Sequence, residues 1–264
     1  MNFATITTGA RAELPWLLAQ FDPAVERASL FDAFDAIALG WHTISVGGLL
    51  VDAAPNLFRR HLLRVGEDGV RLQHLCEARQ LAAPPASKTL PLLAALAAGD
   101  FSLAAELARL TRTTRAVEDH EYEDEFLWGR VLAELAAPPV AAAAIEPRIF
   151  ELRAAKGSAP YIERIAVVRA ICARDQEAFS TAFVEAARTY EMAIEQKAGA
   201  LGTSPRKIAA DRFIWLEGLA LLGLATRFGL KKPDRRIRFC PPLALVSVEG
   251  RDVAGPPLPL GAWE

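Results

Sequence analysis

Alanine and leucine recur at three- and four-residue spacing along most of the chain, and alternating runs of β-branched residues are nearly absent. Apolar positions at this spacing line one face of an α-helix, because the helix repeats every 3.6 residues. The pattern therefore predicts an all-α fold from Asp22 to Phe228. Any strand is expected mainly in the region after Lys231.

The N-terminal part, residues 1–85, is predicted to contain long helices. Asp22 and Pro23 are typical of a helix start, because aspartate caps free amides and proline fits the first helical position. The helix that follows carries a stripe of large apolar side chains at helical spacing: Leu30, Phe34, Ile37 and Trp41. This stripe predicts the buried face of the helix.

Glycines in the same part of the chain predict breaks. Residues 23–53 contain three of them, which either interrupt a helix or permit close packing, so two helices or one kinked helix are expected. These three are Gly40, Gly47 and Gly48. The run GEDG at 66–69 likewise predicts a break between a helix over 55–64 and another over 68–82.

Residues 86–229 are predicted to form a core of stacked helical hairpins. In one hairpin Gly99 closes the first helix, because glycine readily adopts the left-handed conformation, and Asp100 caps the second. A similar pattern returns 75 residues later, where Asp175 takes the place of Asp100. Two related helical pairs indicate an irregular architecture that resembles tetratricopeptide repeats.

The remaining elements complete a single helical domain that spans the whole chain. One helix is expected over 118–136, and a longer one from Ser204 to Phe228, where Gly229 ends it. The last part, residues 230–264, contains recurrent prolines and short apolar runs. It is expected to be an extended tail packed across the helices.

Bulk composition excludes several classes of protein. The chain has 264 residues, 52% of them hydrophobic and 23% charged, which is a globular composition. A formal net charge of −2 gives no overall attraction to nucleic acid or to an anionic membrane. The most apolar stretch, residues 213–225, contains Glu217 and is shorter than the roughly 20 residues of a membrane span.

The cysteines and the N-terminus favour a cytoplasmic protein. Cys76, Cys172 and Cys240 are scattered and odd in number, which makes a disulfide framework implausible and a reduced compartment the better fit. The N-terminal residues lack a basic region followed by a continuous apolar run, so we expect no secretory signal.

Motifs of catalysis are missing from the sequence. The Walker loop, the dinucleotide glycine fingerprint, HExxH and GxSxG do not occur. Ser204 and Lys207 match the SxxK string of serine acyl-enzymes, but the companion elements are absent and Ser204 is expected to cap a helix. The histidines are dispersed, so a zinc site is not expected. We predict no enzyme activity, no cofactor and no bound metal.

The most unusual local feature is a run of six carboxylates within residues 118–125. It comprises Glu118, Asp119, Glu121, Glu123, Asp124 and Glu125, interrupted by His120 and Tyr122. A helix N-terminus favours acidic side chains, but two or three would suffice. The excess leaves three interpretations: a solvated face, a surface that meets a basic partner, or a hard-cation site using His120 and Asp124.

We expect this run to contact a partner, with Glu121, Asp124 and Glu125 exposed. Apolar contacts would come from the aromatic residues nearby, Tyr122 and Trp128, although Trp128 is also a candidate for the core. Elsewhere, Glu217 within the apolar helix is expected to reach a buried arginine or the helix edge, with a role in binding a ligand as the alternative. The basic run Lys231, Lys232, Arg235, Arg236 and Arg238 is expected to pair within the protein rather than to bind nucleic acid.

Three segments carry a resemblance to a known family. They are EYEDEFLWGRVLAEL (121–135), RAICARDQEAFSTAFVEAARTYEMA (169–193) and DRFIWLEGLALLGLATRFGLKKPDRRIRFCPPLAL (211–245). In this order they resemble the bacterial immunity protein 49 family, whose members are encoded beside polymorphic toxins and are taken to neutralise them. The resemblance covers roughly residues 90–245, and the proline-rich C-terminal part departs from it.

The resemblance implies an inhibitor of a cognate toxin, acting by protein–protein contact. It implies no catalytic residues. The acidic run separately predicts that the toxin surface facing it is basic. Two other interpretations stay open: a stacked-helix adaptor or regulatory scaffold that binds a protein or peptide, and an enzyme using the carboxylate and histidine segment. The oligomeric state is not predicted.

Overall fold

The computed structural model describes residues 2–137, 142–200, 208–246 and 252–263. Within these ranges the regular elements are all helical, which confirms the predicted all-α fold. The α-helices are α1 (Phe3–Gln20), α2 (Arg27–Leu50), α3 (Pro55–Ala78), α4 (Leu90–Ala97), α5 (Phe101–Leu110), α6 (Glu123–Ala136), α7 (Ala142–Ala154), α8 (Ile162–Ala173), α9 (Gln176–Gly199) and α10 (Leu216–Arg227).

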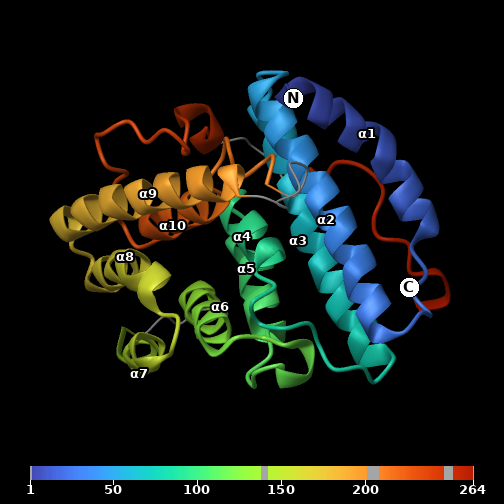
Figure 1. Ribbon diagram of the computed structural model, residues 1–264, viewed down its shortest axis with the longest axis horizontal. Helices are drawn as coiled ribbons and strands as arrows, with labels where there is room; N and C mark the ends of the chain where they lie inside the picture. Colours follow the sequence, from blue (N-terminus) through green and yellow to red (C-terminus); the bar gives the residue numbers. More distant parts are fainter. Residues whose placement is uncertain (1, 138–141, 201–207, 247–251, 264) are drawn as a thin grey trace.

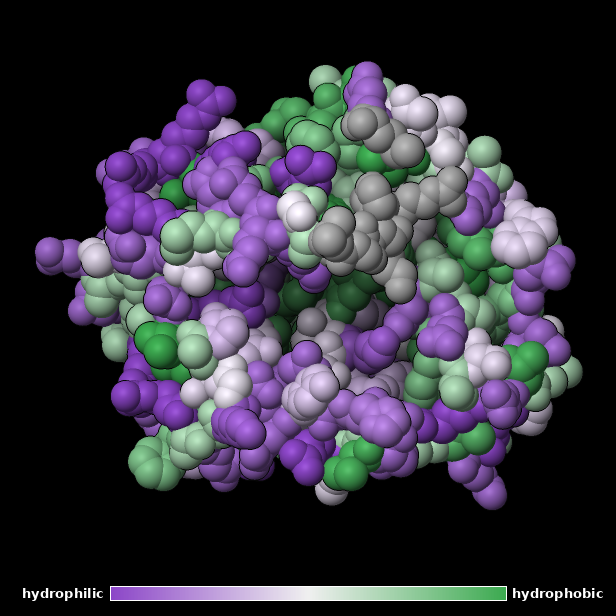
Figure 2. All heavy atoms as spheres, in the orientation of Figure 1, coloured by the Kyte–Doolittle hydropathy of each residue, from purple (hydrophilic) through white to green (hydrophobic). Residues whose placement is uncertain are grey.

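The helices form a chain of neighbouring pairs around one apolar core. Helices α1, α2 and α3 lie side by side, and α3 packs against α4 (Figure 1). On the other side of α4 lies α10, which also contacts α8, while α8 pairs with α9. The buried apolar side chains form one continuous cluster through these layers. On the face shown in Figure 2, hydrophobic residues lie scattered among hydrophilic ones.

Helix α2 confirms the predicted apolar stripe but begins later than expected. All four stripe residues are buried. The helix starts at Arg27, because the preceding residues form a turn in which Asp22 accepts a hydrogen bond from the Ala24 amide (2.8 Å). The carbonyl oxygens of Pro23 and Val25 accept hydrogen bonds from Arg79 at the end of α3. They are therefore engaged outside the helix.

The predicted break at 66–69 is wrong, and of the two roles left open for Gly40, Gly47 and Gly48 the structure shows close packing. Helices α2 and α3 each run without interruption through these positions. A Cβ added to Gly47 would lie 2.1 Å from the Thr7 side chain of α1, and one added to Gly66 would lie 2.7 Å from Leu103 of α5. The glycines are thus places where another helix approaches closely.

Among the described residues, α2 is the one helix that is long and apolar enough to cross a membrane. In its most apolar 18-residue window, 67% of the residues are buried inside the fold. A core helix passes the same test of length and composition. Because α2 packs against α1 and α3, it is a core helix of this fold.

Both predicted hairpins are confirmed. Gly99 has φ = 75°, and Asp100 accepts a hydrogen bond from the Leu103 amide (2.9 Å) at the start of α5. In the second hairpin, Arg174 takes the same left-handed conformation (φ = 54°). Asp175 there accepts hydrogen bonds from the first amides of α9. A short aspartate side chain at a tight turn specifies each hairpin locally.

The predicted helix from Ser204 to Phe228 is wrong in its first part. Residues 208–213 form turns and α10 begins at Leu216; Ser204 itself lies outside the described residues. The amide of Trp215 donates to the carbonyl oxygen of Phe239 (2.8 Å), which ties this point to a distant segment. The end was predicted correctly, since Gly229 has φ = 87° directly after the helix.

The C-terminal residues 252–263 return to the N-terminal layer and lie along α3. The Leu258 amide donates to the buried carboxylate of Asp68 (3.0 Å), and the Leu258 carbonyl accepts from Arg71 (3.0 Å). Leu258 itself is fully buried.

The three cysteines are free, and burial, the largest cause, raises the pKa of Cys76 to about 11.

Asp68 gives the protein a measurable pH dependence. Its side chain is 1% exposed, and burial raises its pKa from 3.8 to about 6. The folded state therefore binds this proton more tightly than the unfolded chain does, and the resulting stabilisation is lost as pH rises through about 6. Between pH 5 and pH 8, Asp68 should cost the wild type about 1.4 kcal/mol.

Urea unfolding at these two pH values checks this prediction. From pH 5 to pH 8, the unfolding free energy of wild type should fall by about 1.4 kcal/mol relative to that of Asp68→Asn. Identical pH profiles for the two proteins would show that Asp68 does not titrate in this range.

Candidate protein-binding site

The acidic run begins in a turn and continues into α6, so the predicted helix over 118–136 starts too early. Residues Val117–Asp119 form one turn of 3₁₀ helix, and His120 adopts the left-handed conformation (φ = 57°). Helix α6 begins at Glu123 after Tyr122, its N-cap. Because His120 lies outside α6, the expected one-turn spacing of His120 and Asp124 on a helix does not exist.

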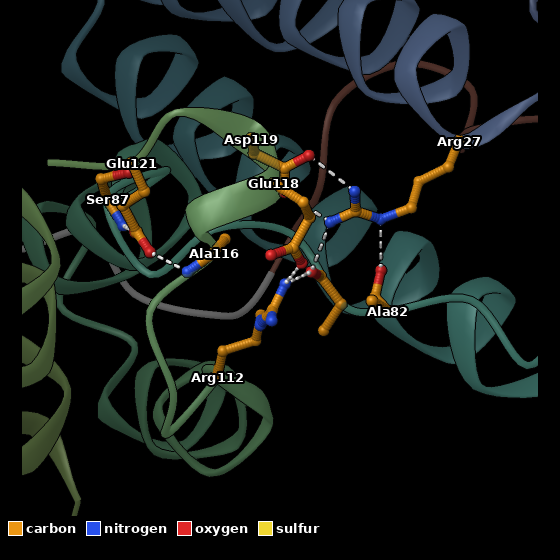
Figure 3. Close-up of polar contacts among 9 residues, drawn as sticks. Arg27, Ala82, Ser87, Arg112, Ala116, Glu118, Asp119 and Glu121 are labelled. Carbon is orange, nitrogen blue, oxygen red and sulfur yellow. Dashed lines mark hydrogen bonds and ion pairs between the residues drawn. The ribbon is translucent and has the colours of Figure 1, made fainter.

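Asp119 is joined to Arg27, the first residue of α2. The two guanidinium nitrogens donate to the two carboxylate oxygens at 2.6 and 2.5 Å, and both side chains are about one-fifth exposed (Figure 3). The same guanidinium donates to the carbonyl oxygen of Ala82 (2.9 Å) and stacks on the ring of Phe31 (4.7 Å). A planar bidentate pair of this kind fixes orientation as well as distance.

Glu118 forms an ion pair with Arg112 after α5 (2.9 Å; Figure 3). The hydrogen bond from Arg112, the largest cause, holds the pKa of Glu118 below its ordinary value. Arg112 also donates weakly to the carbonyl oxygen of Ala83 (3.4 Å). Its charge is therefore shared between the acidic turn and the loop that joins α3 to α4.

Glu121 is buried, which corrects the expectation that it is exposed to a partner. Only 7% of the residue is accessible. One carboxylate oxygen accepts from the Ser87 amide (2.7 Å) and the other from the Ala116 amide (2.7 Å; Figure 3). A carboxylate that satisfies two backbone donors at once is a structural cross-link between the turn and the loop.

Three of the six carboxylates thus fasten the turn 117–121 to the loop 82–89. Arginines from α2 and from the segment after α5 complete the connection. The same loop forms one wall of a cavity of about 320 Å³, mostly apolar, against α2 and α3. Its walls include Phe31, Phe34, Leu72, Pro85 and Leu107, with the ion pair of Asp35 and Lys88 at its edge.

Four residues in and directly before the run remain available at the surface. Tyr122 is 70% exposed and Val117 is 60% exposed, which are large values for apolar side chains. Glu123 and Glu125, in the first turn of α6, are exposed and have no ion-pair partner among the described residues. A fixed turn therefore presents an aromatic ring, an aliphatic side chain and two unpaired carboxylates.

Asp124 belongs neither to the carboxylates that hold the turn nor to the fully exposed ones. It is partly buried and approaches Gly157, whose φ of 103° few other residues adopt: a Cβ there would lie 2.9 Å from its carboxylate. Burial first, and then the charge of Asp124, raise the pKa of Tyr161 to about 12. Asp124 thus belongs as much to the contact between α6 and the segment before α8 as to the surface.

Trp128 belongs to the core and not to the exposed surface. It is 4% exposed, its ring packs against Tyr161, and its indole nitrogen donates to Glu217 (3.3 Å). Glu217 in turn forms an ion pair with Arg164 (3.0 Å). This confirms the prediction that Glu217 reaches an arginine.

The remaining candidate sites are a metal site and the basic run at 231–238. Within the described ranges, no group of three or more His, Cys, Asp or Glu side chains is placed to hold a metal ion. In the basic run, Arg238 pairs with Glu191 and Glu195 of α9, which confirms internal pairing for this residue.

The partners of the acidic run could not have been found from the sequence. Arg27 lies 92 residues from Asp119, and Ser87 lies 34 residues from Glu121. No local spacing rule connects such positions. Comparisons of the chain with protein-family models, with curated proteins and with solved structures gave no match.

Proposed function

We propose that this protein is an immunity protein that binds a cognate bacterial toxin in the cytoplasm and neutralises it by protein–protein contact. The observation that carries the proposal is the fixed turn that exposes Tyr122 and Val117 beside the unpaired carboxylates of Glu123 and Glu125. The resemblance of residues 90–245 to the immunity protein 49 family supports the same function. The proposal requires no catalytic group, cofactor, metal, nucleic acid or membrane.

The composition of this surface suits a basic protein partner. Exposed tyrosines are frequent hot spots, since they bury a large area at little cost in side-chain entropy. Unpaired carboxylates beside them attract a basic surface and accelerate encounter. The turn is held by Arg27, Arg112 and Glu121, so binding would not have to order it first.

A second candidate function is that of an adaptor that binds peptides. It is favoured by the C-terminal residues 252–260, which lie along α3 as an extended ligand would. In that case the acidic surface would be a secondary feature. The two functions use different residues and can be tested separately.

Protection of cells tests the toxin proposal. The toxin encoded next to this gene is expressed together with wild type or with the variant Tyr122→Ala/Glu123→Lys/Glu125→Lys. All three side chains are exposed, so the variant should fold with a loss below about 2 kcal/mol, mostly from the helix dipole of α6. Wild type should restore growth, and the variant should fail to protect.

The matched control is Glu163→Lys/Glu177→Lys. It changes the net charge as much as the two lysines of the variant and also places both lysines in first turns of helices, α8 and α9. It should protect like wild type. Equal protection by the folded triple variant would place the interface elsewhere, and the absence of a toxin gene beside this one would contradict the function itself.

A further inference from the structure

Hydrogen bonds from α3 to its backbone hold the C-terminal segment 252–260 on that helix. At Leu258, the amide donates to Asp68 (3.0 Å) and the carbonyl oxygen accepts from Arg71 (3.0 and 3.3 Å). One acidic and one basic side chain, one helical turn apart, thus hold both polar backbone groups of a single residue. A clamp of this kind binds the backbone of an extended chain, so its hydrogen bonds do not depend on which side chain Leu258 carries.

A second clamp lies four residues earlier. The carbonyl oxygens of Ala254 and Gly255 accept hydrogen bonds from Arg64 (3.3 and 3.0 Å), and the Ala254 amide donates to the carbonyl oxygen of Arg60 (3.3 Å). Arg64 is only 7% exposed, so its guanidinium is directed into this contact and not into solvent. The two clamps follow one face of α3.

The side chains of the segment show which ligand chemistry this face accepts. Ala254, Leu258 and Leu260 are buried, whereas Pro256 and Pro257 are exposed. Gly255 has φ = 75° and touches the ring of Trp41, where an added Cβ would lie 2.2 Å from a ring carbon. The prolines keep the chain extended before it binds, which lowers the entropy lost on binding.

We infer that this face of α3 is a binding site for extended peptides of the pattern Ala-Gly-Pro-Pro-Leu-Pro-Leu, and that the chain's own residues 254–260 occupy it as an intramolecular ligand. A partner that presents a proline-containing segment of this kind competes for the same two clamps. In the described part of the chain, the hydrogen bonds that hold residues 252–260 to the rest of the protein go to α3. The segment is therefore bound as one unit, independently of the acidic surface.

Exchange of the segment tests this inference in the full chain. A protease recognition sequence replaces residues 247–251, and the folded protein is cut there. A fluorescent peptide with the sequence of residues 252–263 is then added, and its anisotropy is measured. The cut protein should bind the peptide at least tenfold more tightly than the uncut protein, because the tethered segment has a millimolar effective concentration.

Variants distinguish a specific site from adhesion. The peptide with Leu258→Ala should bind the cut protein at least tenfold more weakly, and so should the normal peptide when the protein carries Arg71→Ala. A peptide with Pro257→Ala, at an exposed position, should bind within about threefold of the original. Equal binding of all three peptides would overturn the inference.

Two further results would also contradict it. If the cut protein retains its own segment through gel filtration and takes up no labelled peptide over a day, the segment is a permanent part of the core. If circular dichroism shows that loss of the segment unfolds the helices, no site exists without it.

Discussion

Replacing Glu121 by alanine should lower the free energy of unfolding by about 4 kcal/mol. The substitution removes the acceptor of the Ser87 and Ala116 amides, both of which it binds at 2.7 Å. Each buried amide left without a partner costs about 1–3 kcal/mol. Ala116 is completely buried, so water cannot easily replace the lost acceptor there. Urea unfolding followed by circular dichroism measures the effect.

The control for this prediction is Glu123→Ala, two residues later in the same acidic run. Glu123 is exposed and contributes only its interaction with the start of α6, so its loss should cost less than about 1 kcal/mol. Similar losses for the two variants would mean that Glu121 does not cross-link the turn and the loop. The distinction between carboxylates that hold the turn, such as Glu121, and exposed carboxylates, such as Glu123, would then be wrong.

Replacing Gly129 by alanine should cost about 3 kcal/mol or more. In α6 this glycine faces the loop that Glu121 holds, and an added Cβ would lie 2.2 Å from the carbonyl oxygen of Ala86 and 2.7 Å from its carbonyl carbon. The obstacle is backbone, and the neighbouring Ser87 amide is already bound to Glu121. Overpacking against such a fixed contact usually costs about 1–3 kcal/mol, occasionally more, and this contact is unusually close.

Gly9→Ala in α1 is the matched control, because it is the same substitution in a helix with nothing within 4 Å of the new methyl group. Alanine is the better helix former, so this variant should gain up to about 1 kcal/mol. The two variants should therefore shift the urea midpoint in opposite directions. A shift of the same sign and size would contradict the close approach of α6 to the loop.

Local signals in the sequence predicted the parts of the fold that depend on neighbouring residues. The apolar stripe of α2 and the aspartate caps at Asp100 and Asp175 act within one or two helical turns, so spacing alone identifies them. Gly229 likewise ends α10 through its own backbone conformation. These elements could be placed without knowledge of the tertiary structure.

The errors concern residues whose roles depend on distant segments. Gly66 was expected to lie at a break between two helices, but it lies within α3 and leaves room for Leu103 of α5. The acidic run was expected to contact a partner, with Glu121 exposed. Asp119 and Glu121 are instead engaged by α2 and by the loop before α4, and a sequence pattern contains no information about such partners. Tyr122, Glu123 and Glu125 are exposed, and their contact with a partner stays a prediction.

The rate of association with the toxin tests the central claim most directly. Stopped-flow mixing of the purified toxin with wild type should give a rate constant that falls as salt increases, because ions screen the attraction over about 8–10 Å. The variant Tyr122→Ala/Glu123→Lys/Glu125→Lys should associate at least tenfold more slowly at low salt and lose most of that salt dependence. The control Glu163→Lys/Glu177→Lys should match wild type. If the folded triple variant associates as fast as wild type, with the same salt dependence, the turn at Tyr122 is not the surface that meets the toxin.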